Sequence, residues 1–163
     1  MAKSKEEKTN VMRVLEQKKI AYSAHTYPHE EGVAVDGVTV AKSMGFDPAI
    51  VFKTLVARGA SKQYYVFDVP VAENLDLKKA AKAVGEKSIE MIHQKELLPL
   101  TGYVHGGCSP VGMKKLFPTV FHSSAENLAA MIVSAGKIGY QVELAPHDLA
   151  ALVRAKFADL IAE

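Results

Sequence analysis

The sequence contains a single cysteine, Cys108, and no long run of apolar residues. One cysteine cannot form an intramolecular disulfide, so we expect a reducing compartment and a fold that needs no cross-link. A membrane-spanning helix needs about 20 consecutive apolar residues, and a secretory signal needs a shorter apolar run behind a basic start. The sequence shows neither pattern, and we therefore expect a cytoplasmic protein without a membrane partner.

An excess of one charge is also nearly lacking, because 20 lysines and arginines stand against 18 aspartates and glutamates, and the formal net charge is +2. Proteins that wrap a long nucleic-acid duplex without sequence preference need many phosphate contacts, and this balance argues against that class. A contact with one RNA end needs only a few lysines, so the local count around a site matters more than the total.

The composition is that of a globular protein, with 48% hydrophobic and 23% charged residues in a chain of 163. A disordered chain would be poorer in hydrophobic residues. A chain of this length buries a sizeable core without disulfides. We expect one domain over residues 1–163.

Apolar spacing and turn residues predict short helices and short strands in irregular alternation. The first predicted helix begins with Ser4 and Glu7, which have the spacing of a capping box. The predicted helices cover 4–19, 38–44, 76–84, 94–98, 125–130 and 147–162. The predicted strands cover 20–27, 51–57, 63–69, 88–92, 119–121, 131–134 and 140–144, the second and third forming a hairpin. Because regular strand–helix–strand alternation is absent, we expect an α+β fold with a mixed, curved sheet packed by helices.

Neither metal sites nor nucleotide-binding loops have a clear signature. Among six histidines, His25 and His29 are four residues apart, but Pro28 between them would break the helix that a zinc site of this spacing requires. We therefore expect no metal and no cofactor. The glycine-rich stretch 102–112 matches neither the P-loop nor the dinucleotide fingerprint, so it is either a tight loop or a backbone surface that binds an anion.

Two residues are candidates for chemistry. Cys108 would need a nearby base and a lowered pKa to act as a nucleophile, and His105 is close in sequence, but a small buried filler is the better interpretation. Lys53 lies in the predicted strand 51–57, where alternation places it on one face with Leu55 and Ala57. A lysine on such a face either extends to the rim of the sheet or meets an anion, and the two interpretations are equally good.

Several segments, in order along the chain, resemble those of one family. They are His25-Thr26-Tyr27, Phe52-Lys53-Thr54-Leu55, the loop from Thr101 to Gly112 with Gly106-Gly107-Cys108-Ser109-Pro110, and Ser134-Ala135-Gly136-Lys137. In these residues, and over about residues 5–160 as a whole, the sequence is similar to the YbaK/EbsC family of free-standing aminoacyl-tRNA deacylases. That family is related to the editing domain of bacterial prolyl-tRNA synthetases.

The resemblance implies a barrel-like mixed sheet surrounded by helices, and an enzyme that clears cysteine from proline tRNA without metal or cofactor. It also implies that the substrate's own thiol attacks its ester carbonyl, which expels the tRNA's terminal ribose hydroxyl and leaves a thiolactone. The protein then contributes positioning and charge stabilisation, and Cys108 is a bystander. The implied partners are the acceptor end of aminoacyl-tRNA and prolyl-tRNA synthetase, because the short, nearly neutral chain shows no separate domain that would select the tRNA.

The family's functional residues fall on definite positions of this chain. The resemblance makes Lys53 the anchor for an RNA phosphate or the carbonyl region. It makes Gly106 the backbone group beside the carbonyl, and Ser134 the residue that orients the aminoacyl group. The remaining implied substrate contacts are Tyr27, Thr54, Gly107, Ser109, Gly136, Lys137 and Gln141.

Gln141 is a departure, because many relatives have an aspartate there, and Ile138 replaces an arginine. Loss of the carboxylate removes the obvious partner for the substrate's ammonium group, although the amide oxygen still accepts a hydrogen bond. Two alternatives stay open. One is a deacylase for another small amino acid such as alanine, which would need an activated water or tRNA hydroxyl, and the other is a non-catalytic module that binds aminoacyl-tRNA or a synthetase. A surface or metabolic protein on the same fold is disfavoured by the missing export signal.

Overall fold

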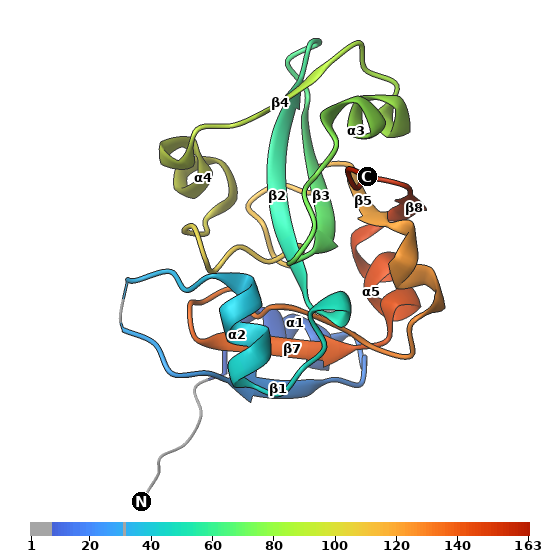
Figure 1. Ribbon diagram of the computed structural model, residues 1–163. Helices are drawn as coiled ribbons and strands as arrows, with labels where there is room; N and C mark the ends of the chain where they lie inside the picture. Colours follow the sequence, from blue (N-terminus) through green and yellow to red (C-terminus); the bar gives the residue numbers. More distant parts are fainter. Residues whose placement is uncertain (1–7, 31) are drawn as a thin grey trace, which may run out of the picture.

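Strand pairing divides the molecule into two sheets, which lie one above the other in Figure 1. The structure, a computed structural model, describes residues 8–30 and 32–163. The lower sheet has three antiparallel strands in the order β1 (Ser23–Thr26), β7 (Tyr140–Leu144) and β6 (Met131–Ser134). It therefore joins the N-terminal part of the chain to two strands that are more than a hundred residues away.

The upper sheet has five strands and a mixed pairing. Its order is β4 (Ile89–Met91), β2 (Phe52–Gly59), β3 (Tyr64–Pro70), β5 (Thr119–His122) and β8 (Lys156–Ala158). The β2–β3 and β2–β4 pairs are antiparallel, whereas β5 is parallel to β3 and β8 is parallel to β5. The predicted α+β class, the mixed sheet and the hairpin of β2 and β3 are confirmed.

The two sheets meet at the beginning of β2. An isolated parallel bridge pairs Val51 with Ile132 of β6, and both side chains are buried. Among the residues that the structure describes, this bridge joins the two sheets. The junction matters for function, because residues from distant parts of the sequence converge there.

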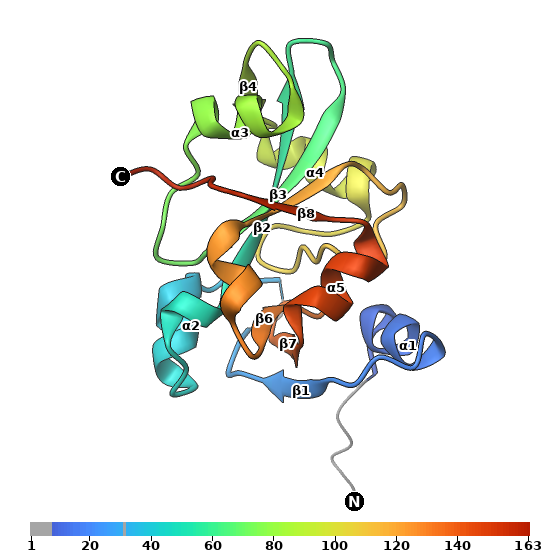
Figure 2. The ribbon, with the colours of Figure 1, turned by 90° about the vertical axis from the view of Figure 1, so that its right-hand side faces the viewer.

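Two helices cover opposite faces of the lower sheet, as the two views in Figures 1 and 2 agree. Alternation along β6 sends Met131 and Val133 to the core that contains α1 (Asn10–Gln17). Ile132 points the other way and packs with Ala41 of α2 (Gly37–Ser43). The same alternation places Ser134 on the face covered by α2.

The remaining helices have local sequence signals. Asp76 Oδ1 accepts hydrogen bonds from the N–H groups of Lys78 and Lys79 at the start of α3 (Leu77–Val84), and Gly85 ends that helix at a φ of 75°. The other elements are α4 (Gln94–Thr101), α5 (Pro146–Val153) and the 3-10 turns η1 (Pro48–Ile50) and η2 (Ser123–Asn127). No helix in the described part of the chain is long and apolar enough to cross a bilayer.

Several predicted helices differ from the structure in extent or type. The proposed capping box of Ser4 and Glu7 lies outside the described residues. α1 begins at Asn10, behind Thr9, whose hydroxyl accepts a hydrogen bond from the Met12 N–H at 3.3 Å. The helix predicted at 125–130 is instead the 3-10 turn η2, and α4 runs three residues farther than predicted, to Thr101.

The prediction of one long C-terminal helix over 147–162 is wrong. α5 ends at Val153, Arg154 has a φ of 58°, and Lys156–Ala158 forms β8 beside β5 (Figure 2). An apolar residue that fits a helical stripe is also buried in this arrangement. Leu160, which follows β8, is fully buried against the sheet and α3. Pairing with β8 supplies hydrogen bonds to the backbone groups at the edge of β5. If the helix continued, those groups would have no strand partner.

Candidate active site

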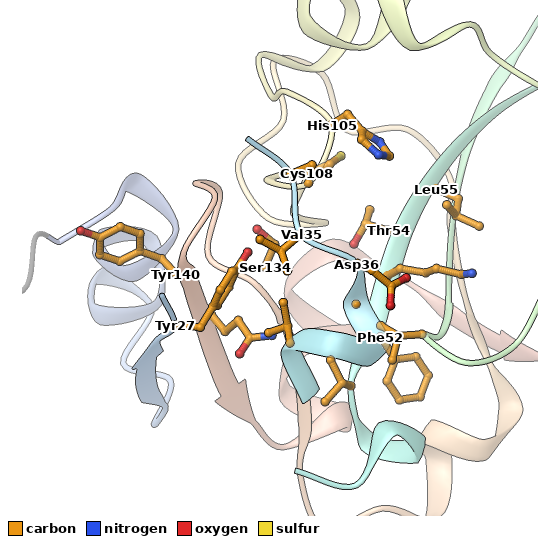
Figure 3. A pocket seen from close by; sticks show the side chains of 18 of the residues that line it. Tyr27, Val35, Asp36, Phe52, Thr54, Leu55, His105, Cys108, Ser134 and Tyr140 are labelled. Atoms are coloured by element: carbon orange, nitrogen blue, oxygen red, sulfur yellow. The ribbon is translucent and has the colours of Figure 1, made fainter. Parts of the chain in front are cut away.

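A cavity of about 490 Å³ lies at the junction of the two sheets. Its walls come from the start of β2 (residues 52–55), the loop before α2 (34–37), the glycine-rich loop around Gly106, and Ser134 and Gln141 of the lower sheet. In Figure 3, Tyr27 and Ser134 lie on one side of the cavity, with Thr54 and Leu55 on the other. The volume is in the range of small-molecule sites, so the cavity suits an aminoacyl end and not an RNA stem.

The three residues predicted to be catalytic meet in this cavity. Lys53 comes from β2, Gly106 from the glycine-rich loop and Ser134 from the end of β6, and all three line the wall. Of the seven predicted substrate contacts, Tyr27, Thr54 and Gln141 also line it. The convergence is a property of the fold, since the three segments are separated by long stretches of chain.

Lys53 lines the cavity from the first half of β2, which has a neighbouring strand on only one side within its sheet. β4 pairs with Ala57–Gly59 and leaves residues 52–55 open on that side. Lys53 is half-buried, and within the described residues its ammonium group makes no hydrogen bond or ion pair. Burial lowers the pKa of Lys53, while the charges of Asp36 and Glu73 oppose that shift. An ammonium group with three unused donors at a cavity wall is suited to a phosphate or a carbonyl oxygen.

Gly106 is required at its position for two reasons. Its φ of 90° lies in the left-handed region, and a Cβ atom there would lie 2.7 Å from the Ala34 Cβ. Within the described residues the Gly106 N–H donates to no protein group. The loop therefore places an unused backbone donor where a close ligand oxygen can accept it.

Ser134 and Gln141 form one polar wall. The Ser134 Oγ accepts a hydrogen bond from the Gly136 N–H at 3.1 Å, so its own proton stays available to a ligand. Gln141 is 6% exposed, and its Oε1 has no partner among the described residues. A buried acceptor without a partner is costly, which makes this amide a candidate contact for a ligand donor.

The sequence analysis missed a carboxyl group behind the cavity. Asp68 on β3 is fully buried, and its Oδ1 accepts a hydrogen bond of 2.5 Å from Thr54 Oγ1. Burial raises the pKa of Asp68 to about 7, and the Thr54 hydrogen bond lowers it by a smaller amount. The sequence does carry a signal for this group, because Asp68 is a single acidic residue inside the apolar run from Tyr64 to Pro70. An acidic residue is unusual in a strand that is buried on both faces.

Cys108 lines the cavity, but its surroundings disfavour the thiolate form. It is 8% exposed, and burial, followed by the charge of Asp68, raises the pKa of Cys108 to about 12. The thiolate needed for attack is therefore scarce at neutral pH. Asp36 and His105 also line the cavity and were not among the predicted site residues.

Four predicted contacts do not line the cavity: Gly107, Ser109, Gly136 and Lys137. Ser109 is fully buried and its Oγ accepts from the Val111 N–H at 3.2 Å, which shapes the loop. A Cβ on Gly107 would lie 3.0 Å from the Ile138 backbone nitrogen, and one on Gly136 would lie 3.0 Å from Tyr103 Cε1. Lys137 Nζ lies 5.4 Å from the centre of the Tyr140 ring. The two glycines thus allow close packing of the loops, and Ser109 fixes its loop by a hydrogen bond. Direct substrate contact by any of the four stays a prediction.

No three metal-ligating side chains gather anywhere in residues 8–30 and 32–163. His25 Nε2 lies 2.8 Å from Glu143 Oε1, and His29 Nδ1 lies 2.8 Å from the Tyr27 carbonyl oxygen. The cavity offers an ammonium group, a backbone N–H, hydroxyl groups and an amide, together with the Asp36 carboxyl, the His105 imidazole and the buried Cys108 thiol. Such a set can bind and polarise an ester.

Comparison with known proteins identifies the family. Residues 32–152 match the aminoacyl-tRNA editing domain. The chain belongs to this family. An Enterococcus faecalis protein named "Putative Cys-tRNA(Pro)/Cys-tRNA(Cys) deacylase EbsC" is 45% identical over 161 residues, which cover 98% of both chains.

Solved structures place the editing domain in the same fold group. The crystal structure of a protein titled "a putative trans-editing enzyme for prolyl tRNA synthetase" is 25% identical, with a TM-score of 0.79 over 94% of this chain and 95% of that one. A hypothetical protein of known structure is 18% identical, with a TM-score of 0.82 over 93% of this chain and 99% of that one, which shows the shared fold alone. The YbaK-type fold expected from the sequence is confirmed.

Proposed function

We propose that this editing domain is a trans-editing deacylase that clears cysteine from proline tRNA. The observation that carries the proposal is the meeting of Lys53, Gly106 and Ser134 in one cavity. The name of the 45% identical relative supports cysteinyl-tRNA as the substrate, and the family supports editing of aminoacyl-tRNA in general. Residues 1–163 then act as one deacylase domain, and charged tRNA as substrate implies the cytoplasm.

The ester binds with its carbonyl oxygen toward the donors of the cavity. The Gly106 N–H donates to the carbonyl oxygen, and the Lys53 ammonium neutralises charge on that oxygen or on the terminal phosphate. The Ser134 hydroxyl and the Gln141 amide orient the aminoacyl group. These groups are fixed by the fold before the substrate arrives, so they stabilise developing negative charge with little reorganisation.

The substrate supplies its own nucleophile. The cysteine sulfur attacks the ester carbonyl carbon, the bond from that carbon to the ribose oxygen breaks, and a thiolactone leaves the tRNA. The reaction needs neither a metal nor a nucleophile from the protein, which fits a cavity whose one cysteine has a pKa of about 12. An amino acid without a thiol cannot react in this way.

Selection of proline tRNA is proposed to come from a partner, most simply prolyl-tRNA synthetase. The net charge of +2 and the small cavity leave little surface for reading a whole tRNA. The structural relative named for trans-editing with that synthetase supports the same partner here. Strict preference for proline tRNA by the isolated chain on a mixed tRNA pool, unchanged when the synthetase is added, would contradict this part of the proposal.

The experiment that tests the function is deacylation of a panel of mischarged tRNAs with identification of the released product. We expect rapid release from cysteinyl-tRNA as thiolactone and slow release from alanyl-tRNA. Blocking the substrate thiol should stop cleavage. If water were the attacking group, cleavage would continue. Release of free alanine at the faster rate would support the alternative deacylase, and no cleavage of any member would support a binding module.

A further inference from the structure

Asp68 occupies a position where the fold favours an apolar side chain. It lies on β3 between Phe67 and Val69, both fully buried, and directly opposite Thr54 of β2. Its Oδ1 accepts the Thr54 hydrogen bond, and its Oδ2 has no partner among the described residues. Burying a carboxyl group with one oxygen unsatisfied costs stability, and an apolar residue of similar size would avoid that cost. Local rules of this kind are most often broken at functional sites.

Thr54 connects this buried carboxyl to the cavity. Thr54 lines the cavity wall and Asp68 does not. A hydroxyl group both donates and accepts hydrogen bonds, so it can pass its proton to Asp68 Oδ1 while it accepts another from the cavity side. In the described part of the chain, Thr54 is the only hydrogen-bond partner of the Asp68 carboxyl group and therefore its direct link to a ligand.

The proposed reaction requires a proton acceptor, and Lys53, Gly106 and Cys108 do not supply one. Lys53 is a cation in its working form, Gly106 contributes a backbone donor, and Cys108 holds its own proton. The attacking substrate thiol must lose a proton, and the leaving ribose oxygen must gain one. A carboxyl group behind a hydroxyl at the cavity wall is placed to serve both steps.

We propose that Asp68, acting through Thr54 Oγ1, takes the proton of the substrate thiol and returns it to the ribose oxygen, an inference that rests on the proposed deacylase function. The S–H proton passes to Thr54 Oγ1 as the Thr54 hydroxyl proton passes to Asp68 Oδ1. The sulfur electron pair then forms the bond to the carbonyl carbon, and the carbon–oxygen bond to the ribose breaks. The ribose oxygen takes a proton from Thr54, which is restored by Asp68, so the carboxylate is regenerated.

The electrostatic surroundings of Asp68 suit this task. Burial raises its pKa to about 7, near the pH at which a general base works best. Thr54 of β2 lowers the pKa and the Cys108 thiol of the glycine-rich loop is the nearby titratable group. Phe121, its register partner on β5, carries no charge. The carboxylate form is the active one, so activity should rise as the pH rises through about 7.

The kinetic test compares Asp68→Asn with the wild type in single-turnover deacylation of cysteinyl-tRNA from about pH 5.5 to about pH 8.5. Asparagine keeps a hydrogen bond to Thr54 but cannot accept a proton. We expect the maximal single-turnover rate to fall by about 10²–10⁴-fold, with little change in the protein concentration that gives half of that rate. The ratio of wild-type to variant rates should rise about tenfold per pH unit below about pH 7 and then level off, a comparison in which titration of the substrate itself cancels.

Variants of Thr54 test the relay independently. Thr54→Ser keeps the hydroxyl and should retain most of the activity, whereas Thr54→Val removes it and should match the loss in Asp68→Asn. Asp148→Asn, at an exposed carboxyl on α5, is the matched control and should leave rate and pH profile unchanged. If thermal unfolding shows that all variants are folded, a wild-type rate and pH profile in Asp68→Asn would overturn the proposal.

Infrared spectroscopy of the protein alone separates failure of the relay from failure of the proposed function. The wild-type-minus-Asp68→Asn difference spectrum should show a protonated-carboxyl band at about pH 5.5 that disappears by about pH 8.5. A carboxyl group that stays ionised at about pH 5.5, or protonated at about pH 8.5, would overturn the relay even if cysteinyl-tRNA is cleaved. If the band titrates as expected but the wild type cleaves no cysteinyl-tRNA, the proposed function fails and the relay fails with it.

Discussion

Ser134 and Gln141 lie directly opposite each other on the antiparallel strands β6 and β7, and both line the cavity. Opposite residues of an antiparallel pair share a face of the sheet. The hydroxyl of one and the amide of the other therefore form one polar part of the wall of the cavity, which Lys53 also lines. Side chains from the end of β6 and the start of β7 are therefore placed to contact the same part of a ligand.

Lys53→Ala should reduce deacylation of cysteinyl-tRNA by at least about 100-fold, the usual cost of removing a donor that stabilises transition-state charge. Thermal unfolding should change little, because Lys53 makes no hydrogen bond or ion pair within the described residues. Lys78→Ala, an exposed lysine on α3, is the control and should keep wild-type activity. Unchanged cleavage by Lys53→Ala would remove Lys53 from the catalytic machinery.

Gly106→Ala should lose both activity and stability. The left-handed φ costs any L side chain about 1–2 kcal/mol, and the contact with Ala34 forces the loop to move as well. Gly45→Ala is the matched control, because its φ is 76° and an added Cβ would meet nothing within 4 Å. We expect Gly45→Ala to lower stability by about 1 kcal/mol with unchanged kcat, and equal kcat in both variants would argue against a role for the Gly106 backbone.

Gln141→Leu should separate activity from stability. Removing a buried acceptor without a partner relieves its desolvation cost, so the unfolding temperature should stay the same or rise. The substrate loses a hydrogen bond to its ammonium group, which should raise KM about tenfold or more. Gln17→Leu, at an exposed glutamine of α1, controls for the change in side chain. A destabilised Gln141→Leu with normal KM would show that the amide serves the fold.

The contribution of Asp68 to the stability of the wild type should fall as the pH rises from about 4 to about 7, because ionisation of the buried carboxyl favours the unfolded chain. The pKa of Asp68 is about 7 in the folded state, above the value of about 3.9 in an unfolded chain. The folded state thus holds an extra proton in that range, and the loss across it is on the order of 4 kcal/mol. Denaturant unfolding at several pH values measures it. Asp68→Asn should flatten the slope and Asp148→Asn should not, and parallel curves for the wild type and Asp68→Asn would contradict the buried ionisation.

Local signals in the sequence predicted much of the fold. Gly45 and Gly85 end their helices in the left-handed conformation, and the β2–β3 hairpin forms where branched and aromatic residues flank a turn. These features depend on residues within a few positions of one another. The β8 strand escaped prediction because its hydrogen-bond partner, β5, lies more than thirty residues away and its apolar spacing fits a helix equally well.

The candidate site was predicted in part for a similar reason. The resemblance identified Lys53, Gly106 and Ser134, but only the fold shows that their segments share a cavity. Asp68 was missed because its burial and its hydrogen bond to Thr54 arise from strand pairing and tertiary packing. Ser109 and Gly136 do not line the cavity but shape the loops that carry their neighbours, and their contact with substrate stays a prediction.

Single-turnover cleavage of cysteinyl-tRNA(Pro), with the released product identified by mass spectrometry, measures most directly whether Lys53, Gly106 and Ser134 form a deacylase site. We predict thiolactone from the wild type, none from substrate with a blocked thiol, and at least a hundredfold less from Lys53→Ala. Free cysteine as the first product, or equal cleavage by the wild type and Lys53→Ala, would contradict it.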